Sequence, residues 1–74
     1  MVRMRIAEIL KEQSKTKYWL RIQMDGISYQ NLSKIINNET KQIRFYTLDK
    51  LSTVLNVPIG ELFEKTDEDD KKEN

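Results

Sequence analysis

The fold is decided by the stretch Gly26-Ile27-Ser28-Tyr29-Gln30-Asn31-Leu32-Ser33-Lys34-Ile35-Ile36-Asn37. Gly26 can adopt the positive φ of a tight turn, and Ser28 is a preferred N-cap, so a helix is predicted to begin at Tyr29. Ile27 and Leu32 have the spacing of a hydrophobic staple, which fixes the angle at which the chain enters the helix. The stretch therefore predicts a sharp turn that aims a short helix.

The predicted helix has one apolar side and one polar side. On a helical wheel, Leu32, Ile35 and Ile36 lie together. The polar residues opposite and beside them are Gln30, Lys34, Asn37, Tyr29, Asn31, Ser33 and Asn38. Gln and Asn can pair with adenine in the major groove, and Lys can reach guanine or a phosphate. From these residues alone, a DNA-reading helix and an ordinary solvated helix face are equally open.

The composition excludes several classes of protein. Seventy-four residues make one small domain, and the chain has no cysteine and no histidine. A disulfide, a structural zinc site and the usual cysteine or histidine catalysis therefore have no residues to form them. Neither a metal nor another cofactor is expected, and no small-molecule site is evident. The chain also lacks an apolar run long enough to span a membrane and a signal-peptide pattern, which predicts a cytoplasmic protein.

The charge is distributed unevenly along the chain. The overall net charge is +1, but residues 67–74 carry five acids and two bases, which leaves 11 bases and 7 acids, a net of +4, on residues 1–66. A moderately basic domain suits a polyanionic partner, although many soluble domains carry such a charge. We predict a folded domain over residues 1–66 and a disordered acidic tail over 67–74, which serves solubility or competes for the basic face.

An all-helical fold is predicted because only one proline and two glycines interrupt the chain and no long stretch alternates apolar and polar residues. Helices are expected at about 3–13, at 17–24 after a Thr16 cap, from Tyr29, from Leu48 after a Thr47 cap, and as a short last helix that starts with Pro58 and runs through Phe63. In the loop 38–46, Ile43 and Phe45 are expected to turn inward. The expected core consists of Ile6, Ile9, Leu10, Leu20, Met24, Ile27, Leu32, Ile35, Ile36, Ile43, Leu48, Leu51, Leu55, Val57, Leu62 and Phe63.

The second predicted helix is more apolar than the core requires. Tyr18 and Ile22 form an additional apolar pair four residues apart, and Trp19 adjoins it. These side chains either pack against the first helix or the N-terminal arm, or they contact a partner subunit.

The two capped helices and the turn between them have the layout of a helix-turn-helix. The motifs Lys17-Tyr18-Trp19-Leu20, Ile27 to Leu32, Ile36 to Thr40, Ile43 to Leu51 and Leu55 to Phe63 resemble the Cro/repressor-type (XRE-like) DNA-binding domains of bacteria and phages. The resemblance covers residues 3 to about 65. It implies an all-α, five-helix, lambda-repressor-like domain with the helix-turn-helix as its second and third helices.

The resemblance also implies a role for particular residues. Those expected to meet base edges in the major groove are Tyr29, Gln30, Asn31 and Lys34. Those expected to contact phosphates are Lys17, Arg21, Ser28, Asn37, Thr40, Lys41 and Arg44. For Lys17, an ordinary solvated lysine is nearly as good an explanation.

This sequence departs from the family pattern in three places. The turn around Met24-Asp25-Gly26 is one residue longer than usual, which can change the aim of the recognition helix. Arg21 stands where the helices usually touch through a small residue, so either Arg21 points outward to a phosphate or the helices lie further apart. Pro58 replaces the common Ser or Asp cap of the last helix.

The leading hypothesis is a sequence-specific transcriptional regulator that binds double-stranded DNA as a homodimer on a two-fold operator. The alternative is a protein-interaction module, such as an antitoxin or an accessory regulator, with weak DNA affinity. An enzyme is not expected, because the carboxylates show no paired spacing and the glycines form no phosphate loop.

Overall fold

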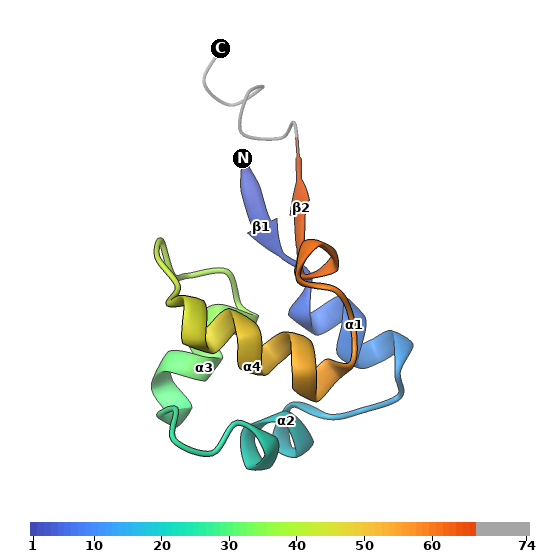
Figure 1. The fold of residues 1–74 in the computed structure, drawn as a ribbon, viewed down its shortest axis with the longest axis vertical. Helices are drawn as coiled ribbons and strands as arrows, with labels where there is room; N and C mark the ends of the chain where they lie inside the picture. Colours follow the sequence, from blue (N-terminus) through green and yellow to red (C-terminus); the bar gives the residue numbers. More distant parts are fainter. Residues whose placement is uncertain (67–74) are drawn as a thin grey trace.

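The domain consists of a helical body and a short β ribbon (Figure 1). The computed structural model describes residues 1–66. Along the chain it contains β1 (Val2–Met4), α1 (Ile6–Glu12), α2 (Lys17–Gln23), α3 (Tyr29–Ile36), α4 (Phe45–Leu55), the single 3-10 turn η1 (Ile59–Leu62) and β2 (Phe63–Lys65). Of the helices in this part of the chain, none has the length and apolarity needed to span a membrane.

One apolar core joins the four helices, η1 and β1. Its buried residues are Met4, Ile6, Ile9, Leu10, Leu20, Met24, Leu32, Ile35, Ile36, Leu51, Leu55 and Leu62. Helical spacing in the sequence predicts all of these core residues except Met4. The remaining predicted core residues, among them Ile27, Ile43 and Phe63, are only partly buried and pack against its edge. The periodic pattern therefore identifies the core, and it fails at the one buried residue that lies in a strand.

The expectation of an all-α fold with five helices is wrong. Residues 2–4 form a strand rather than the start of the first helix, and the last helical element is one 3-10 turn that ends before Phe63. β1 and β2 pair antiparallel, with Arg3 opposite Glu64 and Met4 opposite Phe63. Strands of three residues are too short for alternation to be visible in the sequence, and this pairing depends on the tertiary fold.

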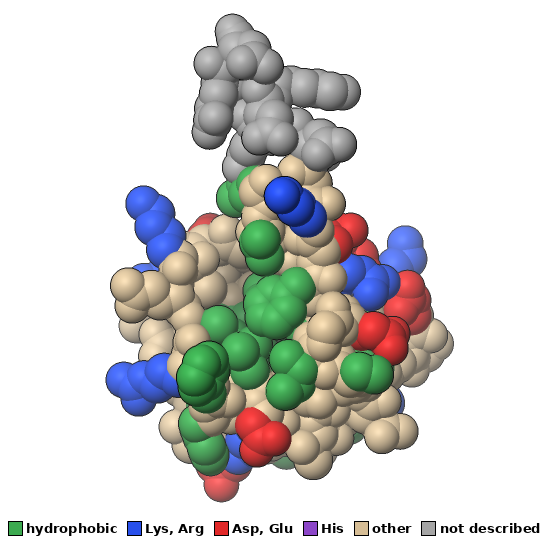
Figure 2. Space-filling view, turned by 45° about the horizontal axis from the view of Figure 1, so that its top comes forward, with side chains coloured by type: hydrophobic (Ala, Val, Ile, Leu, Met, Phe, Trp, Pro, Cys, Tyr) green, Lys and Arg blue, Asp and Glu red, His purple; other side chains and the backbone are tan. Residues whose placement is uncertain are grey.

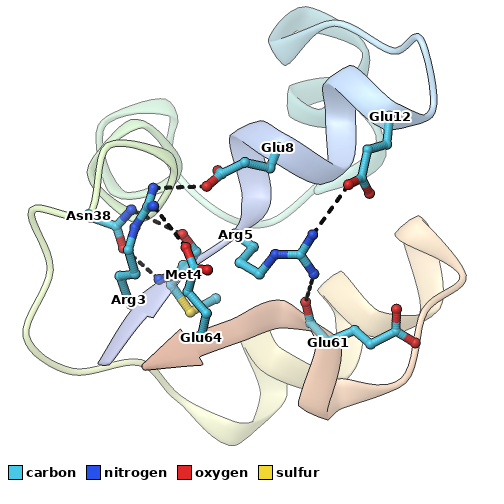
Figure 3. Close-up of polar contacts among 8 residues, drawn as sticks. All are labelled: Arg3, Met4, Arg5, Glu8, Glu12, Asn38, Glu61 and Glu64. Carbon is cyan, nitrogen blue, oxygen red and sulfur yellow. Dashed lines mark hydrogen bonds and ion pairs between the residues drawn. The ribbon is translucent and has the colours of Figure 1, made fainter. Parts of the chain in front are cut away.

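The ribbon is fastened to the helical body by Asn38 (Figure 3). The Asn38 side chain accepts a hydrogen bond from the Met4 backbone N–H at 2.6 Å and donates one to the Met4 carbonyl at 3.0 Å. The Arg3 guanidinium bridges the carboxylates of Glu8 at 3.0 Å and Glu64 at 2.8 Å. These contacts join the two ends of the domain to α1 and to the end of α3.

Three helices end in the left-handed backbone conformation. Ser14 after α1, Asn38 after α3 and Asn56 after α4 have φ values of 57°, 60° and 57°. At α3 the backbone N–H of Glu39 donates to the Lys34 carbonyl at 2.8 Å, the hydrogen bond of a Schellman motif. Asn favours this conformation because its short polar side chain relieves part of the strain. Asn38 therefore both ends α3 and holds β1.

Two expectations about the start of α4 are wrong. The helix begins at Phe45 after an Arg44 N-cap, so Thr47 lies within the first turn, buried at 8% exposure, and does not cap the helix. Phe45 does not turn inward either, because it is 88% exposed. Thr47 is buried on α4 together with Leu51 and Leu55, so the buried side of the helix begins upstream of Leu48.

The predicted packing of the α2 aromatics is confirmed only in part. Trp19 packs against the core, and the Lys15 ammonium lies 4.0 Å from the centre of its ring. Tyr18 and Ile22 remain exposed, at 67% and 55%. Tyr18 and Ile22 thus face outward and form a small exposed apolar area on α2.

Candidate nucleic-acid interface

The turn before α3 is held at three successive residues. Met24 is fully buried, the Asp25 carbonyl accepts a hydrogen bond from the Lys50 ammonium at 2.6 Å, and Gly26 has a φ of 94°. The positive φ at Gly26 confirms the predicted turn. Lys50, on α4, was not among the residues singled out from the sequence, because its contact with Asp25 exists only in the folded chain. The longer turn is therefore an anchored connection between α2 and α3.

The cap of α3 is confirmed. The Ser28 hydroxyl accepts a hydrogen bond from the Asn31 backbone N–H at 3.1 Å, and the helix starts at Tyr29. The equivalent cap of α2 is also confirmed, since the Thr16 hydroxyl accepts from the Trp19 N–H at 2.9 Å. Both helices thus begin where the capping pattern places them.

The outer surface of α3 is a continuous polar ridge. Leu32, Ile35 and Ile36 are buried, which leaves the opposite side of the helix to solvent. The exposed residues of the ridge are Tyr29, Gln30, Asn31, Lys34 and Asn37. Following the helical rotation, Tyr29 stands at one flank, Gln30 and Asn37 at the middle, and Asn31 at the other flank. All the predicted base-reading residues are therefore on one accessible surface.

One flank of the ridge borders a groove of about 280 Å³ between α3, the loop that follows it and the start of α4. Among the site residues predicted from the sequence, those that line this groove are Ser28, Asn31, Lys34, Thr40 and Arg44. Gln42 and Tyr46 line it too and were not predicted. The N-cap residue of α4, Arg44, makes no side-chain capping hydrogen bond. The first backbone N–H groups of α4 therefore lie beside the groove without a side-chain cap from Arg44.

The other flank of the ridge meets α2. A small hollow of about 30 Å³ is lined by Lys17 together with Tyr29, Ser33 and Asn37. The Arg21 guanidinium lies over the Tyr29 ring, 4.7 Å from its centre. Arg21 is exposed, and Leu20 and Leu32 are buried together in the core. Of the two alternatives for Arg21, the structure therefore has the side chain pointing outward.

Two of the predicted phosphate contacts have a different environment. The Thr40 hydroxyl donates to the Gln42 carbonyl at 2.6 Å, so its one proton is already used within the loop. Lys41 is exposed but lines a separate hollow of about 160 Å³, on the side of the loop that faces β1. The structure thus brings Arg44 and Lys34 together and leaves Lys41 apart from them.

The cations around α3 have no carboxylate partner within residues 1–66. The ion pairs of this part of the chain join Arg3 to Glu8 and Glu64, and Arg5 to Glu12. They lie around the ribbon and α1 (Figure 3), whereas Lys17, Arg21, Lys34 and Arg44 surround the polar ridge. A ridge of amides and hydroxyls flanked by cations can bind a polyanion and read hydrogen-bonding edges at the same time.

A comparison with protein-family models agrees with this geometry. The model described as a Cro/C1-type HTH DNA-binding domain matches residues 5–68. The match begins directly after β1 and includes all four helices, the ridge and the groove beside it. Searches of curated proteins and of solved structures found no significant match.

Proposed function

Because the chain belongs to the family of Cro/C1-type helix-turn-helix DNA-binding domains, we propose that it is a sequence-specific regulator of transcription that reads the major groove of double-stranded DNA with α3. The observation that carries the proposal is the exposed ridge of α3, with amide side chains at its middle and, on both flanks, cations that have no carboxylate partner within residues 1–66. An α-helix fits the major groove, where each base pair presents a distinct pattern of donors and acceptors.

The proposed base-reading residues are Tyr29, Gln30, Asn31 and Lys34. Gln30 and Asn31 can donate and accept together, as adenine requires, and Lys34 can donate to guanine. Tyr29 supplies a hydroxyl and a ring that Arg21 covers. These side chains are already exposed on one helix, so the ridge needs no rearrangement of the core to meet a duplex.

The proposed phosphate contacts lie on both sides of the ridge. Lys17 and Arg21 would meet the backbone on the α2 side, and Arg44 on the α4 side, with Ser28, Asn37, Thr40 and Lys41 as further candidates. The start of α4, which has no side-chain cap, supports phosphate contacts on the α4 side, because backbone N–H groups at a helix N-terminus bind phosphate oxygens. Such contacts fix the register of the protein on DNA and carry little sequence information.

We further propose that the protein acts as a homodimer on a two-fold operator. One α3 is only 8 residues long and covers a half-site. Two copies spaced about one helical turn apart would supply the affinity that specific regulation requires.

The proposal is tested first by the salt dependence of binding. Fluorescence anisotropy with a random duplex should show binding at about 50 mM salt that weakens steeply at about 200 mM, because each neutralised phosphate releases counterions. Arg44→Ala should reduce the slope of log K against log salt by about 1, and Lys11→Ala, which removes a cation from α1 instead, should leave it unchanged. Absent or salt-independent binding would favour the protein-interaction module.

A second prediction concerns sequence preference. Duplexes selected from a random pool supply the operator, and Gln30→Ala should then weaken binding to it by about 1–3 kcal/mol and relax the preference at one base pair. The thermal melt should stay nearly unchanged because Gln30 is exposed. Equal loss of affinity for operator and random duplex would place Gln30 outside the base-reading set.

A further inference from the structure

The turn between α2 and α3 is tied to α4 by one side chain. The Lys50 ammonium donates a hydrogen bond to the Asp25 carbonyl at 2.6 Å, across 25 residues of chain. Lys50 lies within α4, next to Leu51, which is fully buried in the core. Hydrogen bonds from a charged donor are stronger than those between neutral groups. One end of this contact is therefore fixed by the core, and the other end holds the turn that is one residue longer than the family pattern.

Few other contacts hold this turn. The Met24 side chain is fully buried, whereas Asp25 and Gly26 are exposed. The Ile27 N–H donates to the Met24 carbonyl at 3.2 Å, but within residues 1–66 only the Lys50 hydrogen bond reaches the backbone of Asp25 or Gly26. A methyl group on Gly26 would meet no atom within 4 Å beyond its chain neighbours, so packing does not hold the turn there either. Lys50 thus supplies a restraint that the local sequence does not.

The first turn of α3 depends on that restraint. Tyr29, Gln30 and Asn31 are all exposed, and the first buried residue of the helix is Leu32. These three exposed residues are proposed to read bases, yet none of them anchors the helix in the core. A binding side chain has to be held within about 0.5 Å of its productive position. A small displacement of the turn would therefore pass directly to the side chains that meet the DNA.

The same contact joins the two sides of the groove beside α3. Gly26 and Ser28 line the groove from the turn, and Tyr46 and Thr47 line it from α4. Lys50 follows Tyr46 by about one helical turn, and its ammonium lies 6.0 Å from the centre of the Tyr46 ring. The hydrogen bond to Asp25 therefore limits how far the two walls of the groove can move apart.

Lys50 does not belong to an extended basic surface on α4. It is the one cation in the sequence of this helix. Phe45 and Tyr46, at the start of α4, are exposed at 88% and 63%, and Figure 2 shows hydrophobic side chains gathered in an area that begins beside the strands and extends over the α4 side of the domain. A surface that follows the phosphate backbone carries a cluster or stripe of cations. The contact with the turn is therefore the better explanation for the charge of Lys50.

We propose that Lys50 is a positioning residue for DNA recognition. By holding the Asp25 carbonyl, it fixes the first turn of α3 relative to α4 and so determines how selectively Tyr29, Gln30 and Asn31 read their bases. The inference deepens the proposed function and rests on it, since Lys50 acts through α3 rather than on a base itself. The restraint on the turn can also be measured without DNA.

The test compares two substitutions of Lys50. Lys50→Met keeps the length of the side chain and removes its donors, whereas Lys50→Arg keeps a charged donor. Fluorescence anisotropy at about 50 mM salt measures binding to the selected operator and to a random duplex, with circular dichroism showing that each variant is folded. K50M should weaken operator binding by about tenfold and random-duplex binding by less than about threefold. K50R should keep its operator affinity within about threefold of the wild type.

Asp25→Asn is the matched control. It changes the side chain of Asp25 but leaves the carbonyl that Lys50 holds, so the ratio of operator to random-duplex affinity should stay within about twofold of the wild type. A ratio in K50M equal to that of the wild type would overturn the proposal, because Lys50 would then be an ordinary phosphate contact or would contribute nothing. A loss of selectivity in D25N as large as that in K50M would also overturn it, since the carboxylate rather than the carbonyl would then be the important group.

A second measurement uses the free protein. Hydrogen exchange followed by NMR should be about tenfold faster at the Ile27 amide in K50M than in the wild type, because this amide closes the turn. The Glu39 amide, bonded to Lys34 at the other end of α3, should exchange at the same rate in both proteins. An Ile27 rate that is unchanged, or that rises only together with the Glu39 rate, would contradict the proposal.

The two proposals can fail separately. Salt-dependent binding with a sequence preference that K50M leaves intact would remove the role of Lys50 and leave the DNA-reading function. A wild-type chain without salt-dependent binding would overturn the DNA-reading function and with it the role of Lys50 in recognition, even if the Ile27 exchange shows that Lys50 holds the turn.

Discussion

Leu32→Ala is expected to lower the free energy of unfolding by about 2–5 kcal/mol. Leu32 is 2% exposed and points from the middle of α3 into the core shared by all four helices. Truncation to alanine removes apolar contacts and leaves a cavity that the short surrounding helices can close only in part. Urea denaturation followed by circular dichroism measures the change, and a domain of this size can lose most of its stability.

The matched control for Leu32→Ala is Gln30→Ala on the same helix. Gln30 is exposed, and alanine is a better helix former, so its effect on unfolding should stay within about 0.5 kcal/mol. Similar destabilisation by both substitutions would mean that the apolar and polar sides of α3 are assigned incorrectly.

Asn38→Ala is expected to cost about 2–4 kcal/mol of folding stability. The substitution removes both hydrogen bonds to the Met4 backbone and leaves that N–H and C=O without their partner, in a residue only 6% exposed. It also places alanine at a φ of 60°, where a residue with a Cβ is strained. Thermal unfolding and amide exchange at Met4 should both report the loss.

Two companion variants separate these causes. Asn38→Gly keeps the backbone conformation available and removes only the side-chain hydrogen bonds. Asn56→Ala is the matched control, because Asn56 has a similar φ of 57° after α4, while its side chain makes no hydrogen bond to the ribbon within residues 1–66. If Asn38→Ala and Asn56→Ala destabilise the domain equally, the Met4 contacts contribute nothing measurable.

Local rules predict much of this fold from the sequence. The Thr16 and Ser28 caps, the turn at Gly26 and the buried side of α3 depend on residues within a few positions of one another, and all are observed. The apolar spacing likewise identifies the core, because a helix that is amphipathic must bury its apolar side.

The parts that sequence reasoning missed depend on distant contacts. Arg3 and Glu64 are 61 residues apart in the chain, and the strand that contains each is only 3 residues long. Met4 is buried because its strand pairs with β2 and is held by Asn38, and neither partner is visible in a local window. The expectation that Phe45 turns inward fails because Thr47, Leu51 and Leu55 are the buried residues of α4, and Phe45 lies on another side of that helix.

The candidate site also combines features set by neighbouring residues, which the sequence predicts, with features set by distant contacts, which it does not. Helical rotation predicts which residues of α3 are exposed, and that prediction is confirmed for the polar side of the helix. Which loop residues stand beside them depends on how the chain returns to α4, and sequence reasoning could not provide Gln42, Tyr46 or the Lys50 contact with Asp25. The predicted contacts with bases and phosphates remain proposals.

The geometry of the ribbon also determines how the domain responds to force. Met1 and Thr66 lie side by side at the same end of the two strands, joined by backbone hydrogen bonds of 2.8 and 2.9 Å. Tension applied through the chain before β1 and after β2 therefore opens the ribbon like a zipper, breaking its hydrogen bonds one after another rather than shearing them together. Once Met4 separates from Asn38, the load passes directly to α1. When the domain is pulled from its two ends, the ribbon is therefore expected to open before the helical core.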